Sequence, residues 1–244
     1  MFGNAGPDSQ GLSSTMRNSY LLTSESVSKG HPDKVADQIS DAIVDLFLSK
    51  DPEARVACET MTTTNRVVLA GEIRGQGIMD EAGNWAPGVR EEIESTVRGV
   101  VKQIGYEQDG FHWDRLDFAN HLHPQSAHIA QGVDAGENKD EGAGDQGIMF
   151  GFACDETPDL MPATLDYSHK ILAEMAADRH AGRAPFLEPD AKSQVTLRFE
   201  DGKPAKATAI VVSTQHKPGY DSGTQQAELH AYVKSVVARV MPAE

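Results

Sequence analysis

The sequence predicts an α+β fold built from repeated β-α-β-β-α-(β) domains, with the helices on one face of each sheet. Two observations predict this class. Apolar residues recur at helical spacing around 32–48, 89–104, 162–175 and 229–240. Between the first two segments, and again between the last two, a pair of strand-like runs is joined by a short turn. The 244 residues are enough chain for one or two domains.

The first half begins with a short strand at residues 20–23, followed by a polar turn that ends at Pro32. Proline suits the first position of a helix, because its missing N–H needs no partner there. Residues 55–63 and 67–74 predict a hairpin. The second helix, residues 89–104, is followed by Gly105, which is placed to end it. Residues 116–118 predict a further short strand.

The second half begins after a long aperiodic stretch, residues 121–147, which is rich in glycine and polar residues. A stretch of this kind is usually functional or mobile. We then expect a strand at 148–154, a helix opened by Pro162, and a hairpin of residues 195–199 and 207–213 turning at Asp201-Gly202. After the last helix the second copy stops at residue 244, where its closing strand is expected to begin.

Composition excludes several classes of function. With 22 basic and 37 acidic residues the net charge is −15, which argues against nucleic acid or an anionic membrane as partner. No apolar run approaches the ~18–20 residues of a membrane span. Residues 1–19 lack the features of a signal peptide and predict a flexible leader. The two cysteines, Cys58 and Cys154, suggest neither a disulfide framework nor a zinc site, so we expect a reducing cytoplasm.

The turn Gly30-His31-Pro32-Asp33-Lys34 could bind a phosphate. A helix beginning here would offer free backbone N–H groups and a positive dipole end. His31 and Lys34 add donors, and Asp33 could hold a magnesium ion. A routine helix start explains the same residues. We interpret Asp37 and Asp41, one and two turns further on, as a solvated face.

Glu59 and Glu72 lie inside the two strands of the first predicted hairpin. A carboxylate on a covered strand is costly unless a cation or several donors meet it. A metal ion or a ligand ammonium would satisfy this need. An edge strand whose acids face water is the alternative.

Two further segments could contact a ligand. Residues 142–147 (GAGDQG) surround Asp145 with glycines that permit close approach, and Asp145 could capture an amine or a ribose hydroxyl. Residues 190–194 (DAKSQ) place Lys192 at the entrance to a strand, where it could meet a phosphate. A solvated lysine at a strand end is the commoner case.

Together these motifs resemble the S-adenosylmethionine synthetase (methionine adenosyltransferase) family, in order and at family spacing, from about residue 20 to the end. The matching stretches are residues 23–28 (TSESVS), 30–41 (GHPDKVADQISD), 57–60 (ACET), 71–73 (GEI), 131–134 (QGVD), 142–147 (GAGDQG), 190–194 (DAKSQ) and 213–216 (STQH).

The resemblance implies a reaction in which the sulfur of L-methionine attacks C5′ of ATP, and the expelled triphosphate is then hydrolysed to phosphate and diphosphate. Each site would use two Mg²⁺ ions, and each subunit one K⁺ ion. The residues it implies are His31 and Lys192 as catalytic groups, His31, Asp190, Ala191 and Lys192 for ATP, Glu72, Gln125 and Asp145 for methionine, Asp33 for Mg²⁺ and Glu59 for K⁺.

The resemblance also implies the domain organisation. Residues 20–124 correspond to the N-terminal domain, 125–147 to a mobile active-site loop and linker, and 148–244 to the central domain. These are two of the family's three pseudo-threefold-related domains. Members form homodimers or dimers of dimers, with each active site between subunits.

Two hypotheses about this chain follow from the absence of the third domain. One is a synthetase polypeptide that is active in a longer form or with a complementing C-terminal chain. The other is a non-catalytic subunit that docks on a full-length synthetase and regulates it. A generic ATP-binding protein of another family is a distant third.

Overall fold

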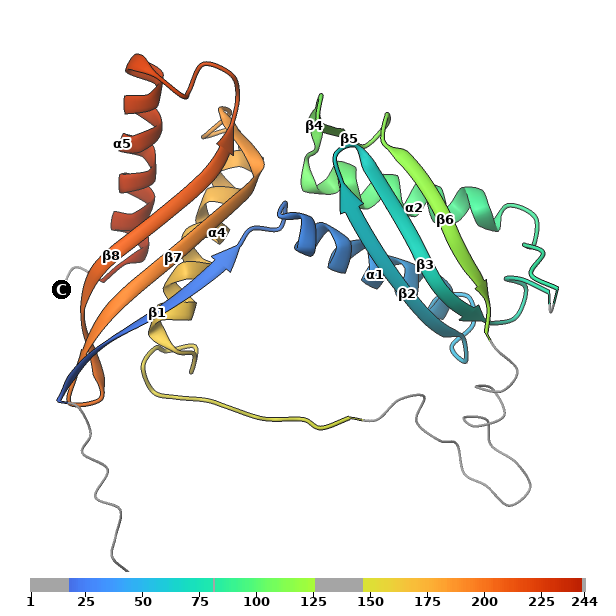
Figure 1. Ribbon diagram of the computed structural model, residues 1–244, viewed down its shortest axis with the longest axis horizontal. Coiled ribbons are helices and arrows are strands. Elements are labelled where there is room, and N and C mark those ends of the chain that lie inside the picture. The colour runs from blue at the N-terminus through green and yellow to red at the C-terminus, as the bar shows by residue number, and fades with distance from the viewer. Residues whose placement is uncertain (1–17, 81, 126–146, 243–244) are drawn as a thin grey trace, which may run out of the picture.

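The computed structural model describes residues 18–80, 82–125 and 147–242. Two three-stranded sheets each carry helices on one face (Figure 1). The first has the order β2-β3-β6, and the second the order β1-β7-β8. The predicted α+β class, with helices on one face of each sheet, is confirmed. In the described part of the chain, no helix is both long enough and apolar enough to cross a bilayer.

The first sheet is formed by β2 (Arg55–Thr63), β3 (Arg66–Arg74) and β6 (Asp117–Pro124), and it packs against α1 (Pro32–Leu48) and α2 (Val89–Ile104). Helix α1 buries residues at helical spacing, from Val35 to Phe47. Helix α2 ends at Gly105, whose φ of 101° is the left-handed cap that glycine allows. A hairpin of two-residue strands, β4 (Glu107–Gln108) and β5 (Phe111–His112), was not predicted, because such strands are too short to show a period.

The second sheet is formed by β1 (Ser19–Val27), β7 (Leu187–Glu200) and β8 (Lys203–His216), with α4 (Ala163–His180) and α5 (Gly223–Val240) on one face. The hairpin turns at Asp201-Gly202 as predicted, with positive φ at both residues. Both of its strands are longer than expected. The start of β7 was not predicted because polar residues interrupt its apolar alternation, although the backbone there is in strand conformation.

The position of β1 corrects one expectation. The repeat predicts that the first strand joins the elements that follow it, but β1 pairs antiparallel with β7 of the second sheet, with Ser19 opposite Glu200 and Val27 opposite Lys192. Strand pairing depends on long-range contacts, which local periodicity does not indicate.

Of the predicted leader, residues 1–17 lie outside the described residues, and Ser19 already belongs to β1. The predicted domain boundaries stay predictions.

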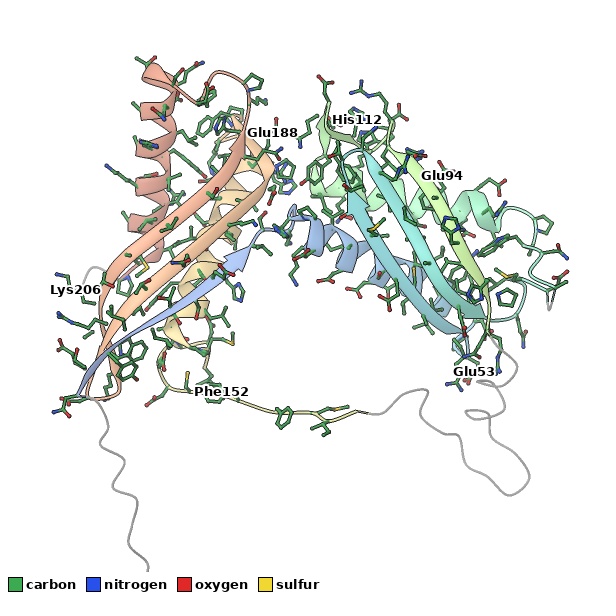
Figure 2. All side chains as sticks on the ribbon, viewed as in Figure 1. Glu53, Glu94, His112, Phe152, Glu188 and Lys206 are labelled. Carbon is green, nitrogen blue, oxygen red and sulfur yellow. The ribbon has the colours of Figure 1, made fainter. Side chains whose placement is uncertain are left out.

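The strand predicted at residues 148–154 is wrong: this segment has no regular secondary structure. Its apolar side chains are mostly exposed, with Met149 at 95% and Phe150 at 92%. The segment runs apart from both sheets, and Phe152 projects from it (Figure 2). The residues are suited to a strand, but no sheet edge of the described chain lies beside them.

Candidate functional site

We call the sheet β2-β3-β6 with α1 and α2 the first unit, and the sheet β1-β7-β8 with α4 and α5 the second unit. The turn between β1 and α1 lies where the two units meet, and Ser28 attaches it to β7. The buried Ser28 hydroxyl donates to the carbonyl of Pro189 and accepts from the N–H of Ala191, both at 2.8 Å. Gly30 packs directly on the same strand, because a Cβ atom added there would lie 2.3 Å from the Pro189 carbonyl oxygen. Only glycine permits this approach of two backbones.

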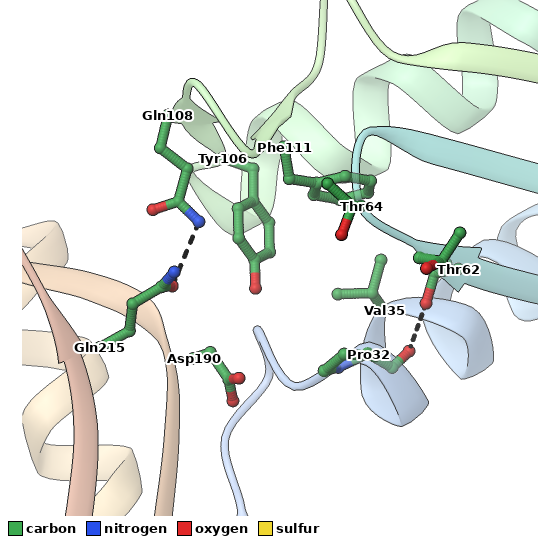
Figure 3. Close-up of a pocket in the computed structure, with 10 residues that line it drawn as sticks. Pro32, Val35, Thr62, Thr64, Tyr106, Gln108, Phe111, Asp190 and Gln215 are labelled. Atoms are coloured by element: carbon green, nitrogen blue, oxygen red, sulfur yellow. Dashed lines mark hydrogen bonds between the residues drawn. The ribbon is translucent and has the colours of Figure 1, made fainter.

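An irregularity in β7 accompanies this contact and contains Asp190. Leu187 is opposite His216 on β8, whereas Ala191 is opposite Thr214, so β7 has extra residues between these pairs. Such bulges redirect side chains and are frequent near functional sites. The Asp190 carboxylate points toward the space between the units (Figure 3). Its Oδ1 atom is buried and has no hydrogen-bond partner among the described residues.

His31 is the N-cap of α1. Its Nδ1 atom accepts a hydrogen bond from the backbone N–H of Asp33 at 3.2 Å, and 13% of its side chain is exposed. A neutral imidazole that accepts at Nδ1 has its proton on Nε2. The ring therefore retains one donor, at the end of α1 where the helix dipole favours an anion.

The predicted ATP residues are brought together at this junction. Burial raises the pKa of Asp190, and the nearby charges of His31 and Lys192 oppose the rise. Lys192 is exposed, while Ala191 beside it is buried. His31, Asp190, Ala191 and Lys192 thus form one cluster, in which a half-buried carboxylate lies near the side chains of His31 and Lys192.

A cavity of about 320 Å³ opens next to this cluster (Figure 3). Asp190 lines it from β7, and the Gln215 side chain meets Gln108 across the junction at 3.2 Å. The remaining lining residues come from the first unit: Pro32, Val35, Thr62, Thr63, Thr64, Tyr106 and Phe111. The cavity wall is therefore shared between the two units.

The residues predicted for methionine and K⁺ lie elsewhere, on the first sheet. Glu59 is exposed on β2 and Glu72 is half-buried on β3. Both side chains occupy the sheet face opposite the helices, since the alternate β3 residues Leu69 and Ile73 are buried. Neither glutamate lines the cavity beside Asp190. No described element covers this face, and both alternatives for Glu59, a cation site or a carboxylate that faces water, stay predictions.

Gln125 directly follows β6, and Asp145 lies outside the described residues. The Gln125 N–H donates to the carbonyl of Ile73 at 3.1 Å, while its side-chain Oε1 is buried without a hydrogen-bond partner in the described chain. Such an atom fits a site that a ligand completes. Most of the predicted loop, residues 126–146, also lies outside the described residues.

Metal ions would meet few ligands here. Over the described residues, no group of three or more His, Cys, Asp and Glu side chains is arranged to hold a metal ion. The side chain of Asp33 is 80% exposed at the start of α1. One exposed carboxylate fits a Mg²⁺ ion that arrives with substrate phosphates, because Mg²⁺ often uses one or two carboxylates plus phosphate oxygens and waters. For K⁺, Glu59 by itself offers a single carboxylate group.

Sequence reasoning missed two residues that shape this junction. Ser28 lies in a stretch that carries the family resemblance, but the sequence predicts no role for it or for Tyr106. Ser28 had a weak signal, because a serine just before a glycine turn often bonds to backbone. Tyr106 follows the end of a helix, and nothing in its local pattern indicates its contact with residue 30.

Comparison with known proteins is consistent with this geometry. Residues 19–127 match the family described as S-adenosylmethionine synthetase, N-terminal domain, and residues 140–244 match its central domain. The S-adenosylmethionine synthases of Erythrobacter litoralis and Novosphingobium aromaticivorans are 76% and 77% identical over 227 residues, covering 93% of this chain and 56% of each relative. That of Rhizorhabdus wittichii is 77% identical over 229 residues, 94% of this chain and 57% of the relative. The chain spans about half the length of these curated relatives. It belongs to the S-adenosylmethionine synthetase family.

Proposed function

We propose that this chain provides the ATP- and methionine-binding residues of a methionine adenosyltransferase, which forms S-adenosyl-L-methionine from ATP and L-methionine and releases phosphate and diphosphate. The observation that supports this function best is the cluster at the junction. His31 caps α1 next to Asp190 and Lys192, so an N–H donor, a helix N-terminus and an ammonium group can meet one polyphosphate.

The chemistry requires alignment and charge stabilisation more than a protein nucleophile. A thioether is neutral and weakly nucleophilic, while the leaving triphosphate gains negative charge as its bond to C5′ breaks. Donors held in place before the reaction stabilise that charge without reorganising. In this proposal the His31 Nε2–H and the Lys192 ammonium group act on the triphosphate.

The two cations are proposed to act through this chain's carboxylates. Asp33 would hold Mg²⁺ together with triphosphate oxygens, and Mg²⁺ supplies charge neutralisation when bound. Glu59 would contribute to a K⁺ site on the uncovered face of the first sheet. Asp33 lies at the start of α1 and Glu59 lies on β2, so each can be mutated independently.

The methionine side of the site would be completed between subunits. Glu72 offers a carboxylate to the ligand ammonium, and Gln125 offers a buried amide oxygen that lacks a partner in the described chain. Asp145 is proposed for the same pocket. Because these residues lie apart from the cavity at Asp190, we propose a homodimer or dimer of dimers in which one subunit's methionine residues meet the other's ATP residues.

A non-catalytic subunit is the second candidate, and the exposed apolar segment favours it. Residues Ile148, Met149, Phe150 and Phe152 are at least 81% exposed. Exposed apolar patches of this kind mark interaction sites. In this alternative the chain docks on a full-length synthetase and regulates it without turnover.

One assay separates the two candidates. Formation of S-adenosylmethionine is measured with ATP, L-methionine, Mg²⁺ and K⁺, using this chain alone and with a second polypeptide that supplies the remainder of the 76% identical relative. Catalytic function predicts turnover in the complemented sample and its loss with His31→Asn in this chain. A regulatory subunit predicts binding to a full-length relative, with a rate that His31→Asn leaves unchanged. Absence of turnover in every combination would refute the catalytic proposal.

A further inference from the structure

We propose that Tyr106 and Arg179 are positioning residues that fix the orientation of the peptide preceding His31, and so hold its imidazole in place for the polyphosphate. The inference rests on the proposed function for its purpose, although the positioning itself can be measured without any ligand. Neither residue belongs to the motifs that identify the family in this sequence.

Tyr106 acts on the Gly30 carbonyl. The buried tyrosine hydroxyl donates a hydrogen bond to this oxygen. The ring is held edge-on to Phe111 with a centroid separation of 4.8 Å, and the Tyr106 N–H donates to the carbonyl of Val101 at 3.2 Å. The hydroxyl is therefore presented from a rigid position at the end of α2.

The Gly30 carbonyl and the His31 N–H belong to one planar peptide unit. On its other side, the His31 N–H donates to the carbonyl of Ser28 at 3.0 Å. Hydrogen bonds at both ends of this peptide group determine its rotation. The rotation in turn determines the direction in which the His31 side chain leaves the backbone. Among the described residues, the bond to Ser28 is then the one hydrogen bond left to this peptide group.

Arg179 anchors the element that presents Tyr106. From α4 in the second unit, its Nη2 atom donates to the carbonyl of Ile104 at 2.5 Å. A cation is favoured at the C-terminal end of a helix. The approach is close, since a Cβ atom at Gly105 would lie 2.4 Å from Nη1 of Arg179. Glu188, which lies on β7 on the side toward the first unit, interacts electrostatically with Arg179 (Figure 2).

These contacts form a continuous path across the junction. Arg179 fixes the end of α2, the end of α2 fixes Tyr106, and Tyr106 fixes the peptide before His31. A change in the arrangement of the two units would therefore change the orientation of His31 directly. Ser28 attaches the same turn to β7, so the turn is held from both units.

The test compares Tyr106→Phe with a matched control, Tyr232→Phe. Phenylalanine keeps the packing of the ring on Phe111 and removes only the hydroxyl. Tyr232 also donates a side-chain hydrogen bond, at 2.9 Å to Asp178, but it lies on α5 and does not touch the turn. Exchange of the His31 and Asp33 amide protons is followed by NMR in the ligand-free chain. Tyr106→Phe is expected to accelerate both by about tenfold, the loss of one hydrogen bond, and Tyr232→Phe by less than about twofold.

Binding of inorganic tripolyphosphate with Mg²⁺, measured by calorimetry, is the second readout. Tyr106→Phe is expected to weaken it by about tenfold, while Tyr232→Phe leaves it unchanged. Equal amide exchange in the two variants would overturn the positioning role, as would faster exchange with unaltered affinity. If the unmodified chain binds no tripolyphosphate but the exchange difference is present, the positioning stands and the proposed function fails. Arg179→Gln should reproduce the effects of Tyr106→Phe, and unaltered exchange at His31 would remove Arg179 from the path.

Discussion

Ser28→Ala tests directly what holds the junction together, because one hydroxyl makes hydrogen bonds to two backbone groups. Ser28 is 6% exposed, and its oxygen lies 2.8 Å from both the Pro189 carbonyl and the Ala191 nitrogen. Alanine keeps the volume nearly constant but leaves a buried acceptor and a buried donor without this partner. Each unpaired buried group costs about 1–3 kcal/mol, so for two groups we expect a loss of about 2–6 kcal/mol in the free energy of unfolding.

Thermal unfolding followed by circular dichroism measures this loss. For a chain of this length about 1 kcal/mol corresponds to roughly 2–4 °C, so the melting temperature should fall by about 4–24 °C. Ser49→Ala is the matched control, since the Ser49 hydroxyl donates to the Leu46 carbonyl at 2.8 Å on an exposed surface. Water replaces that bond, and the expected change is below about 0.5 kcal/mol. Equal melting temperatures for the two variants would refute the reasoning.

Three further predictions concern chemistry, pH and association. In the complemented enzyme, His31→Asn should lower kcat more than ATP affinity, and an unaltered kcat would contradict its role. Asp37→Asn should change neither quantity, because Asp37 pairs with Lys34 on the surface. Burial acts to raise the pKa of Asp178, but hydrogen bonds from Arg183 and Tyr232 outweigh it and lower that pKa. The ionised Asp178 carboxylate therefore stabilises the fold above about pH 4, and this stabilisation is lost as the pH falls further. The decrease in melting temperature caused by Asp178→Asn should accordingly be larger at pH 7 than at pH 3. Phe150→Ser should leave the melting temperature unchanged, since the side chain is 92% exposed. The same variant should weaken any self-association seen by sedimentation. If the variant and the unmodified chain sediment alike, Phe150 is not part of the self-association contact.

The helices and the first hairpin could be predicted because their signals are local. Helix α1 begins at Pro32 and ends at Leu48, as its apolar spacing indicates, and α2 ends where Gly105 permits a left-handed cap. These elements each bury one face against the same sheet. The apolar periodicity of a helix indicates its buried face, whichever strand that face packs against.

The motifs indicate which residues form the candidate site, and their roles stay predictions, but the motifs do not indicate how these residues are arranged. The motifs identified His31, Asp190 and Lys192, yet nothing in their local sequence brings residue 31 next to residue 190. Their proximity depends on the pairing of β1 with β7 and on the bulge that redirects Asp190. Glu59 could be placed within a strand from the sequence, but its exposure on β2 could not, and its role toward K⁺ stays a prediction.

The crossing of β1 into the second sheet explains why the site lies at the junction. A strand that pairs with β7 must end beside residues 189–192, and the chain then has to return to the first unit to begin α1. His31 occupies that return, so it lies between the units by topology rather than by any property of histidine. The segment before α4 has the same place in the repeat as β1 before α1, but no described sheet edge lies beside it. We therefore attribute the difference between these two segments, one a strand and one without regular structure, to whether a sheet edge lies beside each. The backbone groups of a strand require hydrogen-bond partners, which a sheet edge provides.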